Sequence, residues 1–148
     1  MNNRLLELRE MQELYQKEIA SVLNVGQKTY STWEIGTRII PLKHLNSLCN
    51  YYDVNADYLL GLTPFIKKVS KVKFLDKKQI GNRIKIIRED NNLSLRDLAK
   101  ELNTTSSTIS AYETGKTLIL TAFAYQIAKK YKISLDWLLG KNSQKYIK

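Results

Sequence analysis

Apolar residues recur three positions apart along this chain and do not alternate with polar residues as they would in a strand. Leu5 and Leu8 show this spacing near the start, and Ile84 and Ile87 show it again in the second half. Side chains spaced in this way share one face of a helix. The pattern therefore predicts a chain that is built from helices.

The sequence repeats itself at an offset of 79 residues without a gap. Asn3 aligns with Asn82, and Arg9 aligns with Arg88. About 17 of 59 aligned positions are identical, which is more than chance gives over that length. The expected division is a first domain at 1–62, a linker at 63–78, a second domain at 79–141 and a tail at 142–148.

Five short helices are expected in each copy. Ser94 is followed three residues later by Asp97, which is a capping-box pattern, whereas Tyr15 at the matching place is a poor cap. Gly61 and Gly140 are expected to end the last helices. The second, fourth and fifth helices are expected near 16–23, 41–51 and 56–60, and near 95–102, 121–130 and 135–139.

The most informative stretch reads as helix, tight turn and helix, with QKEIASVLNVGQKTYSTWEIG in the first copy and LRDLAKELNTTSSTISAYETG in the second. Ala20 and Ala99 are small enough for two helices to cross closely. Asn24 and Asn103 stand at the turn, where Asn tolerates a left-handed backbone. Thr105 suits the N-cap of the next helix.

The helix after the turn has an inward and an outward face. Tyr30 and Trp33 in the first copy, and Ile109 and Tyr112 in the second, lie three apart and are expected to face the core. The residues left facing outward are Gln27, Lys28, Ser31, Thr32, Ser106, Ser107, Ser110 and Ala111.

Three motifs occur in the same order in both copies: Leu/Ile-Ala in the second helix, Glu-x-Gly after the third, and Asp-aromatic-Leu-Leu-Gly near the end. With these motifs the chain resembles the helix-turn-helix family of the Cro and phage-repressor type, also called XRE-like. The resemblance implies an all-α fold of two tandem five-helix lambda-repressor-like DNA-binding domains joined by a basic linker. It also implies that the third helix of each domain enters the major groove, where its side chains read base edges.

The resemblance assigns roles by position. Gln27 resembles the family's adenine reader, because its amide can bond N6 and N7 together, and Lys28 can reach guanine O6 and N7. Gln16 resembles the phosphate contact of the second helix, where the second copy has Leu95. Since serines discriminate bases poorly, the second copy is expected to read sequence less sharply. The expected base contacts are Gln27, Lys28, Ser31, Thr32, Ser106, Ser107 and Ser110, and the expected phosphate contacts are Gln16, Lys17, Arg38, Lys43, Arg96 and Lys116.

Arg9 with Glu34, and Arg88 with Glu113, match an ion pair between the first and third helices of the family. Breaking a buried ion pair from one side costs about 3–5 kcal/mol. These pairs are therefore expected to hold the base-reading helix in place.

The net charge of +10 predicts a polyanionic partner. It is −1 over residues 1–61, +5 over 62–78, +3 over 79–140 and +3 over 141–148. The linker lysines either follow a phosphate backbone or only keep the linker solvated, and the apolar residues among them suit docking onto a domain. These lysines are Lys67, Lys68, Lys71, Lys73, Lys77 and Lys78, and the apolar residues are Val69, Val72, Phe74 and Leu75.

The linker also limits how the two domains share a DNA site. If extended, residues 63–78 span at most roughly 55 Å. Adjacent major grooves on one face of DNA lie about 34–36 Å apart. One chain is therefore expected to be long enough to act as a covalent pseudo-dimer.

No catalytic residues, metal or cofactor are expected. His44 is the only histidine and Cys49 the only cysteine, and both are expected to be packing or surface residues. The large aromatic residues expected in the core are Trp33, Tyr58, Tyr112 and Trp137.

The sequence therefore predicts a transcriptional regulator, a repressor, that binds double-stranded DNA at specific sequences and is not an enzyme. An antitoxin-like or other protein-interaction module with the same fold stays open, as do a protein partner and a homodimer. Met1–Glu10 is polar and charged, and no apolar run approaches the roughly 20 residues of a membrane span. A cytoplasmic location and no membrane partner are expected.

Overall fold

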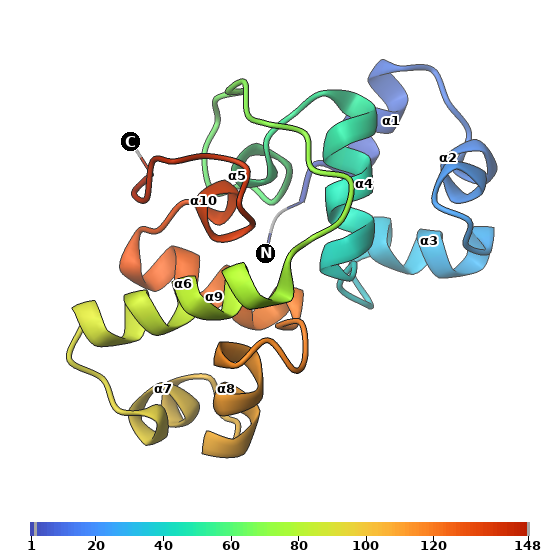
Figure 1. The fold of residues 1–148 in the computed structure, drawn as a ribbon. Helices are drawn as coiled ribbons and strands as arrows, with labels where there is room; N and C mark the ends of the chain where they lie inside the picture. Colours follow the sequence, from blue (N-terminus) through green and yellow to red (C-terminus); the bar gives the residue numbers. More distant parts are fainter. Residues whose placement is uncertain (2, 148) are drawn as a thin grey trace. The chain divides into compact units, whose positions relative to one another are not determined.

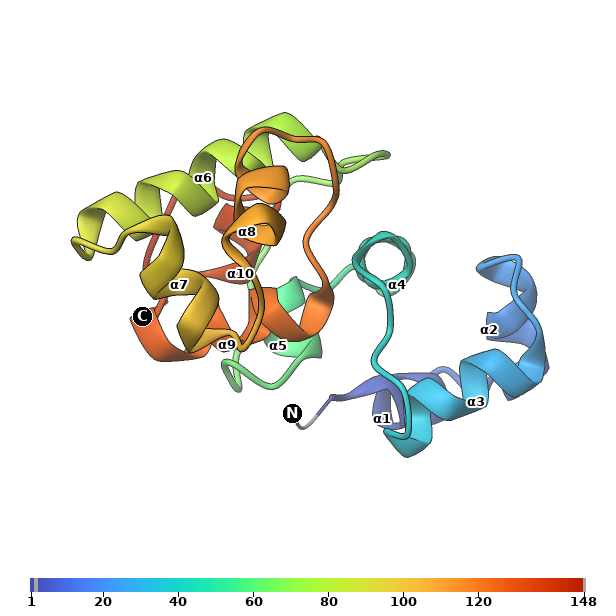
Figure 2. The same ribbon diagram turned by 90° about the horizontal axis from the view of Figure 1, so that it is seen from below.

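The computed structural model describes residue 1 and residues 3–147; Asn2, and Lys148 at the end of the predicted tail, lie outside the described residues. The described residues form ten helices, shown in Figures 1 and 2, and their only β-bridge is an isolated one between Ile133 and Tyr146. The predicted all-α fold class is confirmed. None of these helices is long and apolar enough to span a bilayer.

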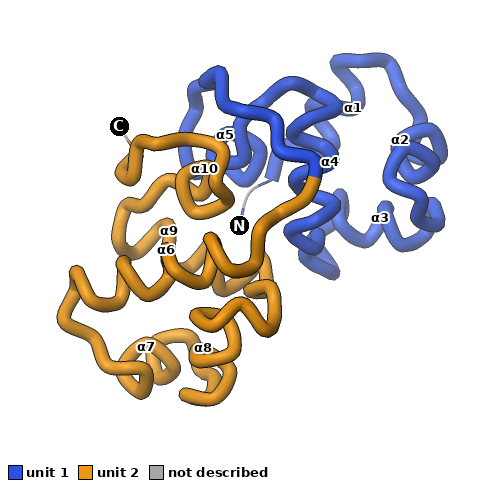
Figure 3. Tube along the Cα trace, in the orientation of Figure 1, with its two compact units in different colours: residues 1–73 blue, residues 74–148 orange. Residues whose placement is uncertain are grey.

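The chain divides into two compact units, residues 1–73 and 74–148 (Figure 3). Each unit contains five helices, as expected. Those of the first unit are α1 (Leu5–Met11), α2 (Gln16–Val22), α3 (Gln27–Ile35), α4 (Leu42–Tyr52) and α5 (Ala56–Leu59). Those of the second are α6 (Lys77–Asp90), α7 (Leu95–Glu101), α8 (Ser106–Glu113), α9 (Thr121–Tyr131) and α10 (Leu135–Leu138).

The helical spacing of apolar residues builds the core of each unit. Leu5 and Leu8 of α1 are buried, and so are Ile84 and Ile87 of α6, as the spacing predicts. Burying such a side chain contributes about 1.5–3 kcal/mol. The aromatic residues predicted for the core, Trp33, Tyr58, Tyr112 and Trp137, are all buried.

The first helix of the second unit starts earlier than the predicted domain boundary at residue 79. Asp76 caps α6, because its Oδ1 accepts hydrogen bonds from the backbone N–H groups of Lys78 (3.0 Å) and Gln79 (3.2 Å). Lys77 and Lys78, predicted as linker, are therefore helical. In the same helix, a Cβ on Gly81 would lie 2.1 Å from the carbonyl oxygen of Tyr112, so only glycine allows α8 to approach this closely.

Most of the predicted linker is fixed to the first unit. Asn46 and Asn50 of α4 each donate an Nδ2 hydrogen bond of 2.9 Å to the carbonyl oxygen of Val72. The backbone N–H of Lys67 donates to Asn55 Oδ1 over 2.9 Å. The assumption of a fully extended linker, and with it the reach of roughly 55 Å, is therefore wrong.

The predicted tail also folds back onto its own unit. The backbone N–H of Ser134 donates to the carbonyl oxygen of Lys145 over 2.8 Å, and that of Ile147 donates to Lys132 over 3.1 Å. The Lys145 ammonium forms an ion pair with Asp90 of α6. Residues 141–147 thus form part of the second unit.

Candidate nucleic-acid interface

Two short helices joined by a tight turn occur in both units, as α2 and α3 and as α7 and α8 (Figure 1). Asn24 and Asn103 at the turns have φ of 55° and 56°, in the left-handed region that the sequence predicted. Ala20 and Ala99 are buried where the helices meet. The first turn is closed by a 2.9 Å hydrogen bond from the Val25 N–H to the Ala20 carbonyl.

The third helix of each unit, α3 or α8, is called the reading helix below. Its inward residues are buried as predicted: Tyr30 and Trp33 in α3, and Ile109 and Tyr112 in α8. Thr105 caps α8, since its Oγ1 accepts from the Thr108 N–H over 3.2 Å. The inward residues fix the rotation of each helix and thereby determine which side chains face solvent.

The predicted base contacts lie along one outer face of each reading helix. Gln27 and Lys28 are exposed in the first turn of α3, and Ser31 and Thr32 are half-buried one turn later. In α8, Ser107 is exposed, and Ser106 and Ser110 are half-buried. The first unit therefore presents an amide and an ammonium, whereas the second presents only hydroxyls.

Buried ion pairs hold both reading helices. Arg9 Nε donates to Glu34 Oε1 over 2.6 Å, and Arg88 Nε donates to Glu113 Oε2 over 2.7 Å. Each arginine also donates to the carbonyl that precedes the second helix, at Leu14 over 2.7 Å in the first unit and at Leu93 over 2.9 Å in the second. One guanidinium thus fixes the first helix, the reading helix and the start of the second helix together.

Gln16 joins this network in the first unit. Its Nε2 donates to Glu34 Oε2 over 3.0 Å, a contact that the sequence did not predict. Burial alone would raise the pKa of the Glu34 carboxyl, but the hydrogen bonds from Arg9 and Gln16 outweigh burial and lower the pKa. In the second unit Leu95 occupies the matching place and donates no such bond.

The other predicted phosphate contacts lie at the ends of the helices and in the loops that follow the reading helices. Lys17 and Arg96 are exposed in the first turns of α2 and α7. Arg38 and Lys116 are exposed after the reading helices, and Lys43 is exposed at the start of α4. The backbone therefore distributes cations around both helix pairs.

Two residues that the sequence aligned without a role turn out to be structural. Arg4 lies with its guanidinium carbon 4.1 Å from the Tyr58 ring centroid and donates to the Thr63 carbonyl over 3.0 Å. Arg83 stacks on Trp137 at 4.8 Å. The signal was their alignment at the repeat offset next to a buried aromatic residue.

His44 and Cys49 pack as expected. The His44 ring lies 5.3 Å from that of Trp33, and burial and the neighbouring Lys43 lower its pKa. Cys49 is buried in α4. Within the described residues, no cluster of histidine, cysteine and carboxylate side chains is arranged to hold a metal ion.

Comparison with known proteins shows where this architecture recurs. Residues 2–63 and 81–143 each match the family model described as "Helix-turn-helix domain". The "Uncharacterized HTH-type transcriptional regulator YobD" of Bacillus subtilis (strain 168) is 32% identical over 81 residues, which cover 52% of this chain and 72% of that protein. The "HTH-type transcriptional regulator ImmR" of the same organism is 38% identical over 68 residues, covering 46% of this chain and 54% of that protein.

Proposed function

Because the chain belongs to the helix-turn-helix domain family and carries its domain twice, we propose that it binds double-stranded DNA at specific sequences and represses transcription. The observation that carries this proposal is the outer face of α3. It presents Gln27 and Lys28 from a helix whose rotation is fixed by two buried aromatic residues and by the Arg9–Glu34 ion pair. The "HTH-type transcriptional regulator" names of both relatives support the same role.

The proposed reading mechanism starts in the first turn of α3. A short helix fits the major groove, which is about 12 Å wide. Gln27 donates to adenine N7 and accepts from adenine N6, and Lys28 donates to guanine O6 and N7. Because both side chains extend from a rigidly held helix, little additional ordering is required when DNA binds.

Phosphate contacts are proposed to set the depth and register of α3. Gln16 starts α2, and its amide is held beside the reading helix by Glu34. Lys17, Arg38 and Lys43 add cations on the same unit, and Arg96 and Lys116 do so on the other. Such contacts position the protein without reading sequence.

Repression rather than activation is proposed, because a protein that occupies the groove excludes other proteins from the same bases. The two reading helices of one chain supply what two protomers supply in a homodimer, so one chain is proposed to suffice for one site. A binding role needs no catalytic group, and we propose no enzymatic activity. The proposed location is the cytoplasm, and the proposed partner is DNA alone.

The test is binding-site selection from random duplex DNA with the whole chain, followed by affinity measurements against salt. Six to ten phosphate contacts should weaken binding by roughly 10³–10⁵ between 50 and 200 mM salt. A competitor duplex of scrambled sequence separates specific from general binding. An affinity that does not change with salt, or a stable stoichiometric complex with a protein and none with DNA, would refute the proposal.

A further inference from the structure

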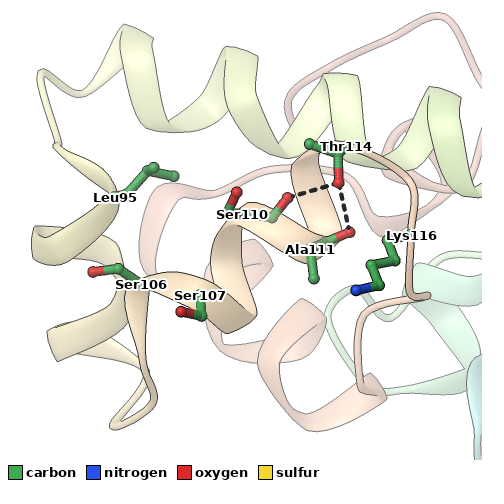
Figure 4. A pocket seen from close by; sticks show the side chains of 7 residues that line it. All are labelled: Leu95, Ser106, Ser107, Ser110, Ala111, Thr114 and Lys116. Carbon is green, nitrogen blue, oxygen red and sulfur yellow. Dashed lines mark hydrogen bonds between the residues drawn. The ribbon is translucent and has the colours of Figure 1, made fainter.

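The second unit has a shallow depression of about 420 Å³ over the outer face of α8, beside the start of α7 (Figure 4). Its lining contains no acidic residue and a single basic one. The lining residues are Leu95, Ser106, Ser107, Ser110, Ala111, Thr114 and Lys116. The depression therefore lies on the face that the first unit uses for its long polar side chains.

The lining is more aliphatic than its composition indicates. Thr114 Oγ1 donates to the carbonyl oxygens of Ser110 (3.0 Å) and Ala111 (3.3 Å), the two bonds drawn in Figure 4. Since the helix backbone uses that hydroxyl, the methyl group is the part of Thr114 left to contact a ligand. With the Ala111 methyl and the Leu95 side chain it supplies three aliphatic groups, and three serine hydroxyls accompany them.

The first unit has different chemistry at the matching positions. Gln16 stands where Leu95 stands, and Gln27 and Lys28 stand where Ser106 and Ser107 stand. The first unit therefore presents amide and ammonium groups, and the second leaves an open space lined by methyl groups. The short side chains at all these positions create a receptor for a small apolar group.

We propose that this depression accepts the C5-methyl groups of thymines, so that α8 reads thymine by apolar contact while α3 reads base edges by hydrogen bonds. The inference rests on the proposed function, because it requires α8 to enter a major groove. Among the four bases, only thymine presents a methyl group there, and alanine and threonine methyls are suitable partners for it. Serine hydroxyls donate or accept, and so they tolerate either neighbouring base.

The DNA side of the test replaces thymine by deoxyuridine, which keeps base pairing and removes only the methyl group. The probe is the duplex selected by the whole chain from a random pool, and the variant Gln27→Ala first identifies the half-site read by α3. In the other half-site, each contacted thymine should lose about fourfold in affinity on replacement, the factor that corresponds to one buried CH₂ group. Unchanged affinity at every thymine of that half-site overturns the inference.

The protein side of the test is Thr114→Ser, which keeps the hydroxyl and its two hydrogen bonds but removes the methyl group. This variant should bind the thymine duplex more weakly and should no longer distinguish thymine from deoxyuridine at one position. Thr108→Ser is the matched control, because it removes a methyl group from the same helix outside the depression. A thymine preference that survives Thr114→Ser at every position places the methyl contact elsewhere and overturns the assignment.

The outcomes separate this inference from the function on which it rests. If no duplex is selected or bound, the proposed function fails. If a duplex is bound specifically and its thymine methyl groups have no effect, only the inference fails.

Discussion

Gln16 Nε2 donates a 3.0 Å hydrogen bond to Glu34 Oε2, which ties the first residue of α2 to the last turn of the reading helix α3. The same carboxylate accepts from Arg9 of α1. The side chain proposed to contact phosphate and the helix proposed to read bases are therefore held by one group. The second unit keeps the arginine and the carboxylate but has Leu95 in place of the glutamine.

Gln16→Leu, which copies the second unit, should weaken DNA binding about equally on all sequences. A hydrogen bond to a charged group contributes about 1.5–3 kcal/mol, and this variant removes the amide that is proposed to donate it to a phosphate. Because the amide is neutral, it releases no counterion, and the slope of log affinity against log salt should stay unchanged. Fluorescence anisotropy titrations at several salt concentrations measure both quantities.

The reverse exchange, Leu95→Gln, is the matched control for that prediction. It restores the amide beside the Arg88–Glu113 pair and should strengthen binding without changing sequence preference. A loss of folding in Gln16→Leu, seen as a lowered Tm, would show that the Glu34 contact is needed for stability rather than for phosphate.

Gln27→Ala should cost about 1–3 kcal/mol on the preferred site and relax one base position. The reason is that an exposed amide in the first turn of α3 is able to make two hydrogen bonds to one adenine. Ser106→Ala, at the matching place in α8, should cost less. Repeating the site selection with each variant measures the effect, and two equally sharp half-sites for the original chain would contradict the ranking.

The sequence predicted the helices well where local chemistry decides them. Both turn asparagines have the predicted left-handed backbone. The Ser94–Asp97 capping box is formed, because its two partners are three residues apart and need no tertiary contact. Local patterns of this kind require no knowledge of how the helices pack.

What the sequence did not predict depends on contacts between distant residues. Asn46 and Asn50 hold Val72 across more than 20 residues, so a segment with the composition of a linker is ordered on α4. Likewise, the Gln16–Glu34 bond joins residues that neither helical spacing nor the repeat brings together. The Asp76 cap of α6 was local and detectable, but the lysines after it had been interpreted as linker.

Glu34→Gln should destabilise the first unit by about 3–5 kcal/mol at pH 7, because it leaves the buried Arg9 guanidinium without its anion. The pKa of Glu34 is lowered in the folded protein, so its contribution is full above the unfolded value of about 4.3. As pH falls below that value, the unfolded chain binds the proton first and stability declines. The stability gap between the original chain and Glu34→Gln should therefore narrow in acid.

Urea unfolding at pH 7 and at pH 3.5 checks both parts of this prediction. Glu10→Gln is the control, because Glu10 is an exposed carboxylate on α1 outside the ion pair. A gap of constant size at the two pH values would show that the charge on Glu34 does not contribute to stability.

Replacing Lys67, Lys68, Lys71 and Lys73 with Gln should weaken DNA binding about equally on all sequences. The asparagine amides that fix this segment bond to its backbone, so the substitutions leave its anchoring in place. All four side chains are exposed, and the 3.5 Å ion pair of Lys71 with Asp53 is at the surface and contributes little. We expect these lysines to bind phosphates, so the salt slope should fall by about 0.9 for each phosphate that is no longer neutralised.

A comparison at equal charge distinguishes phosphate contact from a general attraction. The pair Lys67→Gln and Lys68→Gln removes the same charge as Lys85→Gln and Lys129→Gln, which lie on α6 and α9 outside the reading helices. Exposed charges beyond about 8 Å from the DNA are largely screened at physiological salt. The first pair should therefore lower the salt slope and the second should not. Equal, small effects of both pairs in folded protein would mean that the lysines only keep the segment solvated, and that phosphate binding is confined to the helix-turn-helix faces.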